Sequence, residues 1–548
     1  MNLRNDRASD QVASSTTDIK FKKLLSFTSF LVAISLLAKI VYLSWTCDDA
    51  LITLRTIDNL LNGYGLRWNV IERVQTYTHP LWLGVLIPFW AVLSDPEVAL
   101  ILPGVLFSAL TIVLLWQYLC NDSEDRVWVF TLLLSSTAFI HFCTSGLENS
   151  LSHFLAVCFC IWLPRADESK PRAILFASIF AALLCLNRLD FALLVFPGLL
   201  LLLVQSPTTS TLRLLAMGLS PLFAWLAFSL VYYGSFVPNT AYAKLGVNWP
   251  LSERLAQGHS YFLFSAITDK GTFYGLLICT ILAAISRYRP AIAVAFGSTL
   301  YCFYVYWIGG DYMGGRFLTT PFIAVVCASM ANQLKRPFKI AFVLLIAILQ
   351  LVPTGIGPLK SLNGIVNEHA HYQEHTGLFT ANHARPSFNH FHPTQLIKNN
   401  ARVITLYTIG YSAFYLGPKV YIVDALGLGD PLMSRLAVPP ENRIRVGHFT
   451  RLLPIGYMET IYSGKNQIKS PIIASTYETI RLVTQGPIWS WERFRAMWKL
   501  HKLGQQLARN GESYRGDSIE PFLRTNPIPP KFEDYRFIRE DGSGTPLR

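Results

Sequence analysis

The feature that most constrains this fold is a series of apolar runs between residues 21 and 353. Many of them approach the ~17–25 residues that a helix needs to cross a bilayer, and residues 354–548 contain no run of that length. The chain is 52% hydrophobic and 15% charged, which is too apolar for an ordinary soluble protein. We therefore predict a polytopic α-helical membrane domain over residues 23–353, followed by an extracytoplasmic α/β domain over residues 354–548.

The apolar runs predict about eleven transmembrane helices. We do not count segments 50–62 and 80–93 as transmembrane helices, because the first is amphipathic and the second is short and contains two prolines. Within a first loop that covers residues 46–97, we interpret the first segment as an interfacial helix and the second as a re-entrant or interfacial helix. The predicted spans cover residues 23–45, 98–119, 127–142, 148–163, 173–187, 190–205, 212–233, 263–286, 290–308, 316–334 and 338–353.

The distribution of positive charge predicts how the spans are oriented. Lys20, Lys22 and Lys23 precede the first span, which places an N-terminal tail of residues 1–22 in the cytoplasm. Each loop that alternation then places inside carries a basic residue, and the odd number of spans places residues 354–548 outside. The net charge of +13 is spread over these short loops and forms no basic stripe, so nucleic-acid binding is not expected.

Polar motifs gather on the side predicted to be outside. A charged residue at the bilayer centre costs about 3 kcal/mol, so these side chains are expected to face water, a partner or a substrate. We therefore expect an outward-facing cavity. The candidate site residues from these motifs are Asp48, Asp49, Arg55, Tyr77, His79, Glu148, Asn149, Arg188, Asp190, Lys244, Asp311 and Arg316.

The chemistry of these residues suits sugar transfer from a lipid phosphate. Such a reaction needs a carboxylate to take the proton of the acceptor hydroxyl, and Asp48 or Asp49 is the candidate base. Adjacent carboxylates raise one another's proton affinity, and they would also permit a divalent cation beside them. The outward cations Arg188, Lys244 and Arg316 are candidates for holding the departing phosphate.

Structural roles remain open for most of these residues. Asp48 or Asp49 would equally cap a helix over residues 50–62, and Glu148 with Asn149 would cap the next span. Two motifs, Arg188 with Asp190 and Asp311 with Arg316, would also form ion pairs at span ends. His79 would either donate to a phosphate or lie at the membrane interface.

The C-terminal part shows weaker signals. Segments 403–407 and 419–423 read as strands separated by a turn and a short helix, which predicts a small α/β module. The preceding histidines have irregular spacing and no joining cysteine or carboxylate pattern, so a structural zinc site is not favoured. These histidines are His369, His371, His375, His383, His390 and His392.

One long motif carries a resemblance to a known family. Residues 48–82, DDALITLRTIDNLLNGYGLRWNVIERVQTYTHPLW, resemble the first extracytoplasmic loop of the mycobacterial terminal β-(1→2)-arabinofuranosyltransferases, which are polyprenyl-phosphate-sugar-dependent enzymes of the GT-C superfamily. The similarity extends to SGLENSL, LNRLD, residues 236–244, residues 309–316 and VDALGLGDP, and so covers most of residues 45–455.

The resemblance implies a GT-C fold and an inverting transferase of arabinofuranose from decaprenyl or undecaprenyl phosphate. It implies that an aspartate at the end of the first span, matching Asp48 or Asp49, is the base. It also implies that Asn239, Lys244, Asp311 and Arg316 line the donor pocket, that the C-terminal domain helps to bind acceptor, and that the protein lies in a bacterial inner membrane with its site in the periplasm.

The resemblance leaves the acceptor open between a cell-envelope glycan and a protein. The C-terminal region is short for a mycobacterial arabinan enzyme, and a similar enzyme of Gram-negative bacteria modifies type IV pilin. Other functional classes are a GT-C transferase of a different sugar, a transporter or flippase of a lipid-linked sugar, and a scaffold. A transporter would favour internal repeats and charges at mid-membrane, whereas these charges cluster at span ends.

Overall fold

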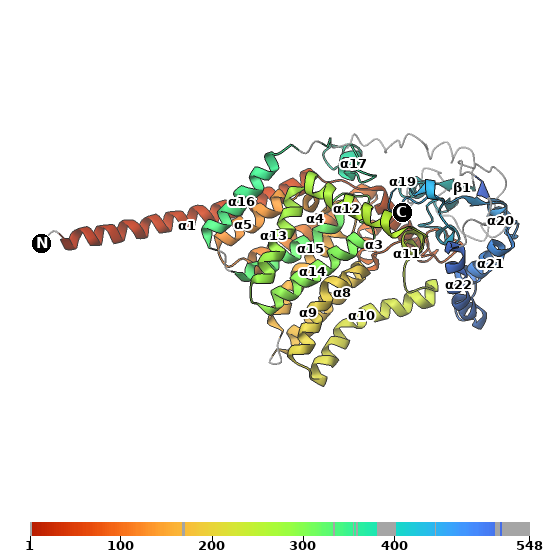
Figure 1. The fold of residues 1–548 in the computed structure, drawn as a ribbon, viewed down its shortest axis with the longest axis horizontal. Coiled ribbons are helices and arrows are strands. Elements are labelled where there is room, and N and C mark those ends of the chain that lie inside the picture. Colours follow the sequence, from red (N-terminus) through yellow and green to blue (C-terminus); the bar gives the residue numbers. More distant parts are fainter. Residues whose placement is uncertain are drawn as a thin grey trace.

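The structure, a computed structural model, is mostly helical and describes residues 3–166, 170–332, 335–353, 356–357, 360–380, 402–443, 445–509 and 516–517. A helical body (residues 96–351) forms the centre, and the first helix α1 (Leu3–Tyr42) extends beyond it at one end. A C-terminal module, the described part of residues 368–517, lies at the other end (Figure 1). Residues 3–22 of the predicted tail thus continue the first helix.

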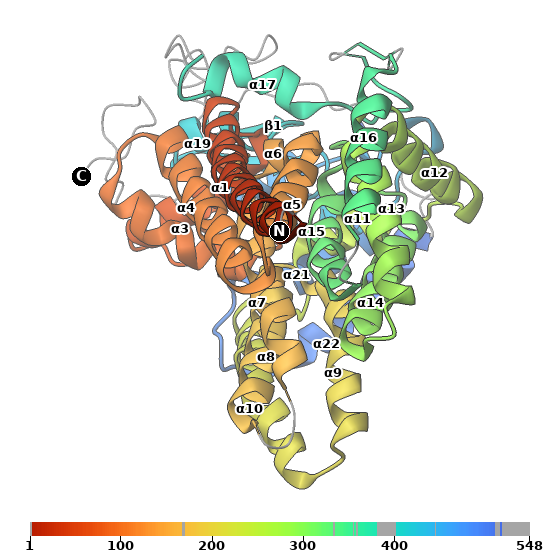
Figure 2. The same cartoon turned by 90° about the vertical axis from the view of Figure 1, so that its left-hand side faces the viewer.

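The body consists of helices that pack side by side. Helix α10 packs along α8, α14 along α9, α1 along α5, and α13 along α15, as the end-on view illustrates (Figure 2). Their bounds are α4 (Pro96–Leu114), α5 (Ser123–Ser135), α6 (Thr137–Phe142), α7 (Asn149–Trp162), α8 (Pro171–Asn187), α9 (Ala192–Gln205), α10 (Thr209–Tyr233), α11 (Asn239–Leu245), α12 (Leu251–Thr268), α13 (Lys270–Ile285), α14 (Arg289–Trp307), α15 (Thr319–Ser329) and α16 (Arg336–Leu351).

Several of these helices have the length and composition of membrane spans. Within the described residues, four meet both criteria, and a bent pair, Leu251–Thr268 with Lys270–Ile285, raises the number to five. Further apolar helices are shorter than a full span. A membrane-embedded helical body is therefore supported, and the count of eleven spans stays a prediction. The four are Lys22–Tyr42, Pro96–Leu119, Thr209–Tyr233 and Arg289–Trp307.

Two predicted spans are not continuous helices. The segment 127–142 breaks at Ser136, and the segment 263–286 breaks at Asp269, where α12 and α13 meet at 106°. The Asp269 carboxylate accepts hydrogen bonds from the backbone N–H groups of Thr137 (3.0 Å) and Ala138 (2.7 Å), and from that of Thr272 (3.3 Å). One side chain thus caps the starts of both α6 and α13. Apolar composition does not reveal such a cap, so the sequence did not predict these breaks.

The first loop contains the two predicted helices, α2 (Asp48–Leu61) and α3 (Pro80–Val92). However, α2 does not lie on a surface, because its residues 50–59 are all buried. The C-terminal module covers its polar face, and the Arg55 guanidinium donates to the carbonyls of Ala413, Gly417 (3.0 Å) and Val420 (3.1 Å). The helix predicted over residues 50–62 is therefore present but is enclosed by protein, and its position relative to the membrane interface stays a prediction.

The C-terminal module contains the predicted strand pair. Strand β1 (Val403–Leu406) pairs in parallel with β2 (Tyr421–Asp424), in the register Val403 to Tyr421 and Leu406 to Asp424. The expected short helix, α19 (Tyr411–Leu416), lies between them. The other elements are α17 (Glu368–Thr376), β3 (Leu453–Pro454), which is antiparallel to β4 (Gly516–Asp517), α20 (Tyr457–Ser463), α21 (Pro471–Gln485) and α22 (Trp491–Arg509).

The module shares its hydrophobic core with the first loop. Tyr64 and Val70 pack in one cluster with residues of β1, β2, α20, α21 and α22, and Ile52 and Trp68 pack in another with residues of β1 and α19. The module and the first loop are therefore expected to fold together. A domain boundary at residue 353 stays a prediction.

A buried carboxyl group at this shared core makes stability depend on pH. Glu72 accepts hydrogen bonds from the Tyr421 hydroxyl (2.8 Å) and from Asn69 (3.3 Å), and burial together with the charge of Asp430 raises the pKa of Glu72 to about 8. Folding therefore favours the protonated form. Stability should fall as pH rises from about 4.5 to about 8, by at most about 1.4 kcal/mol per pH unit from this group.

The change Glu72→Gln should weaken this dependence, because the amide oxygen still accepts from Tyr421 and carries no titrating proton. Thermal unfolding of both proteins between pH 5 and 9 measures the effect. The melting temperature of the wild type should fall more steeply than that of the variant. Parallel curves would contradict the assignment.

Candidate active site

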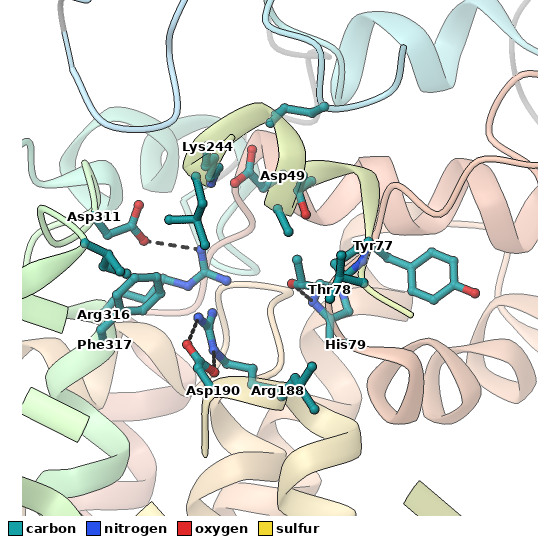
Figure 3. A pocket seen from close by; sticks show the side chains of 18 of the residues that line it. Asp49, Tyr77, Thr78, His79, Arg188, Asp190, Lys244, Asp311, Arg316 and Phe317 are labelled. Carbon is teal, nitrogen blue, oxygen red and sulfur yellow. Dashed lines mark hydrogen bonds and ion pairs between the residues drawn. The ribbon is translucent and has the colours of Figure 1, made fainter. Parts of the chain in front are cut away.

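A cavity of about 370 Å³ lies where the first loop, the body and the C-terminal module meet. Its polar lining comes from the start of α2, the approach to α3, the α8–α9 junction, α11 and the segment 310–317 (Figure 3). Residues far apart in the sequence therefore converge on it, as the sequence predicted. The candidate residues that line it are Asp49, Tyr77, His79, Arg188, Asp190, Lys244, Asp311 and Arg316.

The two adjacent aspartates have different surroundings. The Asp48 carboxylate accepts hydrogen bonds from the backbone N–H groups of Gly410 (2.9 Å) and Tyr411 (2.8 Å), and burial raises the pKa of Asp48 to about 6. Asp49 lines the cavity, and its carboxylate has no hydrogen-bond or ion-pair partner within the described chain. Asp48 thus fastens the module to α2, while Asp49 is the aspartate that a ligand in the cavity can reach.

A fully buried carboxylate, Glu148, lies behind the cationic wall of the cavity. Its oxygens lie 3.0 and 3.1 Å from Nη2 of Arg316, and one lies 3.0 Å from Nη1 of Arg188. Nδ1 of His79 is 3.1 Å away, and Nε2 of the same ring lies 2.8 Å from the Thr53 hydroxyl. Glu148 therefore fixes three basic side chains at the cavity. Its side chain makes no cap hydrogen bond to α7, so the helix-cap alternative is not what the structure shows.

The outward cations differ in how far they are neutralised. Arg188 forms a two-point ion pair with Asp190 at 3.0 and 2.6 Å, and Arg316 lies 3.5 Å from Asp311. Both predicted ion pairs thus exist, and both guanidinium groups still line the cavity (Figure 3). Lys244 has no ion-pair or hydrogen-bond partner among the residues that the structure describes. Its ammonium is the cation most available to an added anion.

Other candidate residues lie outside the cavity or turn away from it. Asn239 donates to the carbonyls of Gly427 (2.9 Å), Leu428 (3.1 Å) and Asp430 (3.1 Å), so it anchors the module to α11. Asn149 donates to the carbonyl of Arg316 (3.2 Å). Arg55 holds the module, as described above. The Tyr77 ring points away from the centre of the cavity (Figure 3), and its hydroxyl lies 2.8 Å from that of Tyr233.

Some lining residues were missed in the sequence. Leu428 and Val446 of the C-terminal module close the cavity, and the Phe317 ring lies under the Arg188 guanidinium at 4.3 Å. Phe317 directly follows the candidate residue Arg316, so its position in the sequence was a usable signal. Leu428 lies in the VDALGLGDP motif, but neither it nor Val446 was marked as a lining residue, because apolar residues in a loop most often serve packing.

No group of three or more histidine, cysteine, aspartate or glutamate side chains able to hold a metal occurs in the described part of the chain. His369, His371 and His375 lie on α17, whereas His383, His390 and His392 fall outside the described residues. A divalent cation beside Asp48 and Asp49 stays a prediction. Because Asp48 is engaged by two backbone N–H groups, Asp49 would supply the open carboxylate.

Comparison with known proteins supports the resemblance seen in the sequence. Residues 25–245 match the model of the Alg9-like mannosyltransferase family of the GT-C superfamily. The chain is 31% identical over 332 residues to the terminal β-(1→2)-arabinofuranosyltransferase of Mycobacterium tuberculosis. The aligned region covers 52% of this chain and 51% of that protein. It is 28% identical over 326 residues to the Corynebacterium glutamicum protein of the same name, covering 52% and 47%. The chain thus spans about half the length of the curated relatives it matches, and the predicted resemblance is confirmed.

Proposed function

We propose that this GT-C-like chain is a membrane glycosyltransferase that moves arabinofuranose from a polyprenyl phosphate to an acceptor hydroxyl outside the cytoplasm. The observation that carries the proposal is the Asp49 carboxylate, which has no partner among the described residues and lies in the same cavity as Lys244 and Arg316. A base and a phosphate-binding cation are the two groups that this transfer requires.

The proposed donor places its phosphate against the cationic wall. Lys244 is the primary contact because no carboxylate of the described residues pairs with it, and Arg316 and Arg188 supply further N–H donors. The remaining walls are largely apolar and suit the isoprenoid chain that follows the phosphate. Those walls include Leu189, Leu193, Leu245, Tyr304 and Ile308.

The proposed reaction is a single displacement with inversion. The oxygen of the acceptor hydroxyl bonds to the anomeric carbon and gives its proton to Asp49. The bond between the anomeric carbon and the phosphate oxygen breaks, and its electron pair leaves with the polyprenyl phosphate. Lys244 and Arg316 stabilise the charge that develops on that phosphate. This chemistry uses no redox cofactor, and a divalent cation near Asp49 would add a further positive charge there.

The nature of the sugar rests on the resemblance to the two arabinofuranosyltransferases. A transferase of another sugar is the second candidate, because the family model that matches residues 25–245 describes mannosyltransferases. The proposed location is a bacterial inner membrane, with the cavity and the C-terminal module on the periplasmic side.

A transfer assay tests the proposal. Purified protein in nanodiscs is given either polyprenyl-phosphate arabinofuranose or polyprenyl-phosphate mannose as donor. An arabinan oligosaccharide and a type IV pilin serve as acceptors, and mass spectrometry detects the added sugar. Transfer of arabinose is the expected result. Transfer of mannose without transfer of arabinose would change the proposed sugar, and the protein would still be a membrane glycosyltransferase. No transfer by folded protein, with the donor intact and both acceptors present, would overturn the proposal.

A further inference from the structure

Helix α22 is fixed to the end of a membrane span. Helix α10 has the length and composition of a span, and only 17% of its most apolar stretch is buried within the protein. The fully buried Arg493 of α22 donates hydrogen bonds to the carbonyls of Val231 (2.7 Å) and Tyr232 (3.0 Å), close to the C-terminal end of α10. Carbonyls at that end of a helix lack partners within the helix, and a cation there satisfies them. Helix α22 therefore lies where α10 leaves the bilayer (Figure 1).

One side of α22 packs against the rest of the C-terminal module. Ala496, Leu500 and Leu507 belong to one hydrophobic cluster with residues of α21. Together with Arg493 they are spaced three, four and seven positions apart, which places them on the same side of a helix. This side holds α22 to the module and to α10, and the opposite side is free to meet a partner.

The opposite side of α22 carries exposed tryptophans among basic residues. Trp491 is 64% exposed and Trp498 is 74% exposed, and their separation of seven positions puts both rings on one face. Trp489, just before the helix, is 78% exposed. Large exposed rings that lie together mark a surface that a partner covers. The exposed cations beside them are Arg495, Lys499 and Lys502.

The three cations have no counterion within the described residues. No hydrogen bond or ion pair engages their side chains there, and the Arg495 guanidinium lies 5.6 Å from the centre of the Trp491 ring. The sequence of α22 contains one acidic residue, Glu492. The exposed face therefore combines apolar rings with net positive charge, and it fits a partner that is negatively charged.

We propose that the exposed face of α22 lies on the membrane surface and binds the headgroups of anionic phospholipids. Tryptophan rings favour the boundary between headgroups and acyl chains, and basic side chains on an interfacial helix pair with lipid phosphates. The junction with α10 places α22 at that boundary. This inference goes beyond the proposed function, and it does not depend on sugar transfer.

Photocrosslinking of the full-length protein tests this inference. Benzoylphenylalanine replaces Trp498, and the protein is reconstituted in nanodiscs with equal amounts of phosphatidylglycerol and phosphatidylcholine. Mass spectrometry after irradiation identifies the molecule that is bonded to residue 498. The expected products are phospholipid adducts in which phosphatidylglycerol exceeds phosphatidylcholine by about fivefold or more, because a single basic side chain near an anionic surface contributes about that factor.

Charge-neutral variants of the crosslinking protein test the role of the cations. The change of both Lys499→Gln and Lys502→Gln should lower the excess of phosphatidylglycerol by about fivefold or more. Lys465→Gln is the matched control, because Lys465 is an exposed lysine of the same module outside α22. The control should keep the full excess.

Each other outcome would overturn the inference. Adducts to a second copy of the protein, in place of lipid, would show that the face is a protein interface. Folded protein without any adduct would show that the face meets water. Lipid adducts with equal amounts of the two phospholipids would contradict the binding of anionic headgroups. If the protein altered at Trp498 does not fold, benzoylphenylalanine replaces Trp491, and the same products are expected.

Discussion

Replacing Asp49 by asparagine should lower kcat by about 10² to 10⁴-fold, the range that a positioned general base contributes. The amide cannot take the proton of the acceptor hydroxyl, whereas its size and polarity match those of the carboxylate. Binding of the lipid donor should persist, because the phosphate contacts Lys244 and Arg316 in the proposed complex. The rate of transfer to an acceptor, measured by mass spectrometry, gives kcat. The binding of polyprenyl phosphate to each protein measures whether the lipid site is intact.

Asp48→Asn is the matched control, since the two aspartates are neighbours in sequence. Its effect should appear in stability, because Asp48 accepts two backbone hydrogen bonds from the start of α19. An asparagine retains one acceptor oxygen, so part of the attachment survives. If Asp48→Asn abolished turnover in folded protein while Asp49→Asn remained active, the roles of the two residues would be reversed.

Glu148→Gln should lower the free energy of unfolding by about 3–5 kcal/mol, the typical cost of removing one partner of a buried ion pair. The neutral amide would leave Arg316, Arg188 and His79 without the carboxylate that they share. We expect the cationic wall to lose its arrangement, so the remaining folded protein should also bind polyprenyl phosphate more weakly. Unfolding in detergent, followed by circular dichroism, measures the stability change.

Asp311→Asn provides the comparison for Glu148. Asp311 lies 3.5 Å from Arg316, and Arg316 keeps its two contacts to Glu148 when Asp311 is changed. The loss of stability should therefore be smaller than for Glu148→Gln. Equal losses would mean that Glu148 does not hold the wall together in the manner described.

The convergence of the polar motifs was predictable from the sequence. His79, Arg188 and Arg316 lie at the ends of apolar segments, and charge at such positions must find water or a counterion. That requirement brings distant motifs to one cavity without any knowledge of helix packing. The shared counterion Glu148 was also among the candidates, although its central position was not predicted.

The sequence does not predict which candidate residues line the cavity and which attach the C-terminal module. Asp48, Arg55 and Asn239 all bind backbone groups of the C-terminal module, and those partners lie between 188 and 365 positions away in the sequence. Backbone carbonyls and N–H groups exist at every position, so no residue pattern marks them as partners. The break at Asp269 was missed for the same reason, because the groups that it caps are backbone N–H groups of α6 and α13.

The most direct test of the central claim is the affinity of polyprenyl phosphate, measured by native mass spectrometry of protein in nanodiscs. Lys244→Ala should bind it about tenfold more weakly or worse, a loss of about 1.4 kcal/mol. Asp49→Asn and Lys335→Ala, which removes an exposed lysine outside the cavity, should bind as the wild type does. Equal affinity in Lys244→Ala and Lys335→Ala would contradict the account, because the cavity would then not be the site of the lipid phosphate.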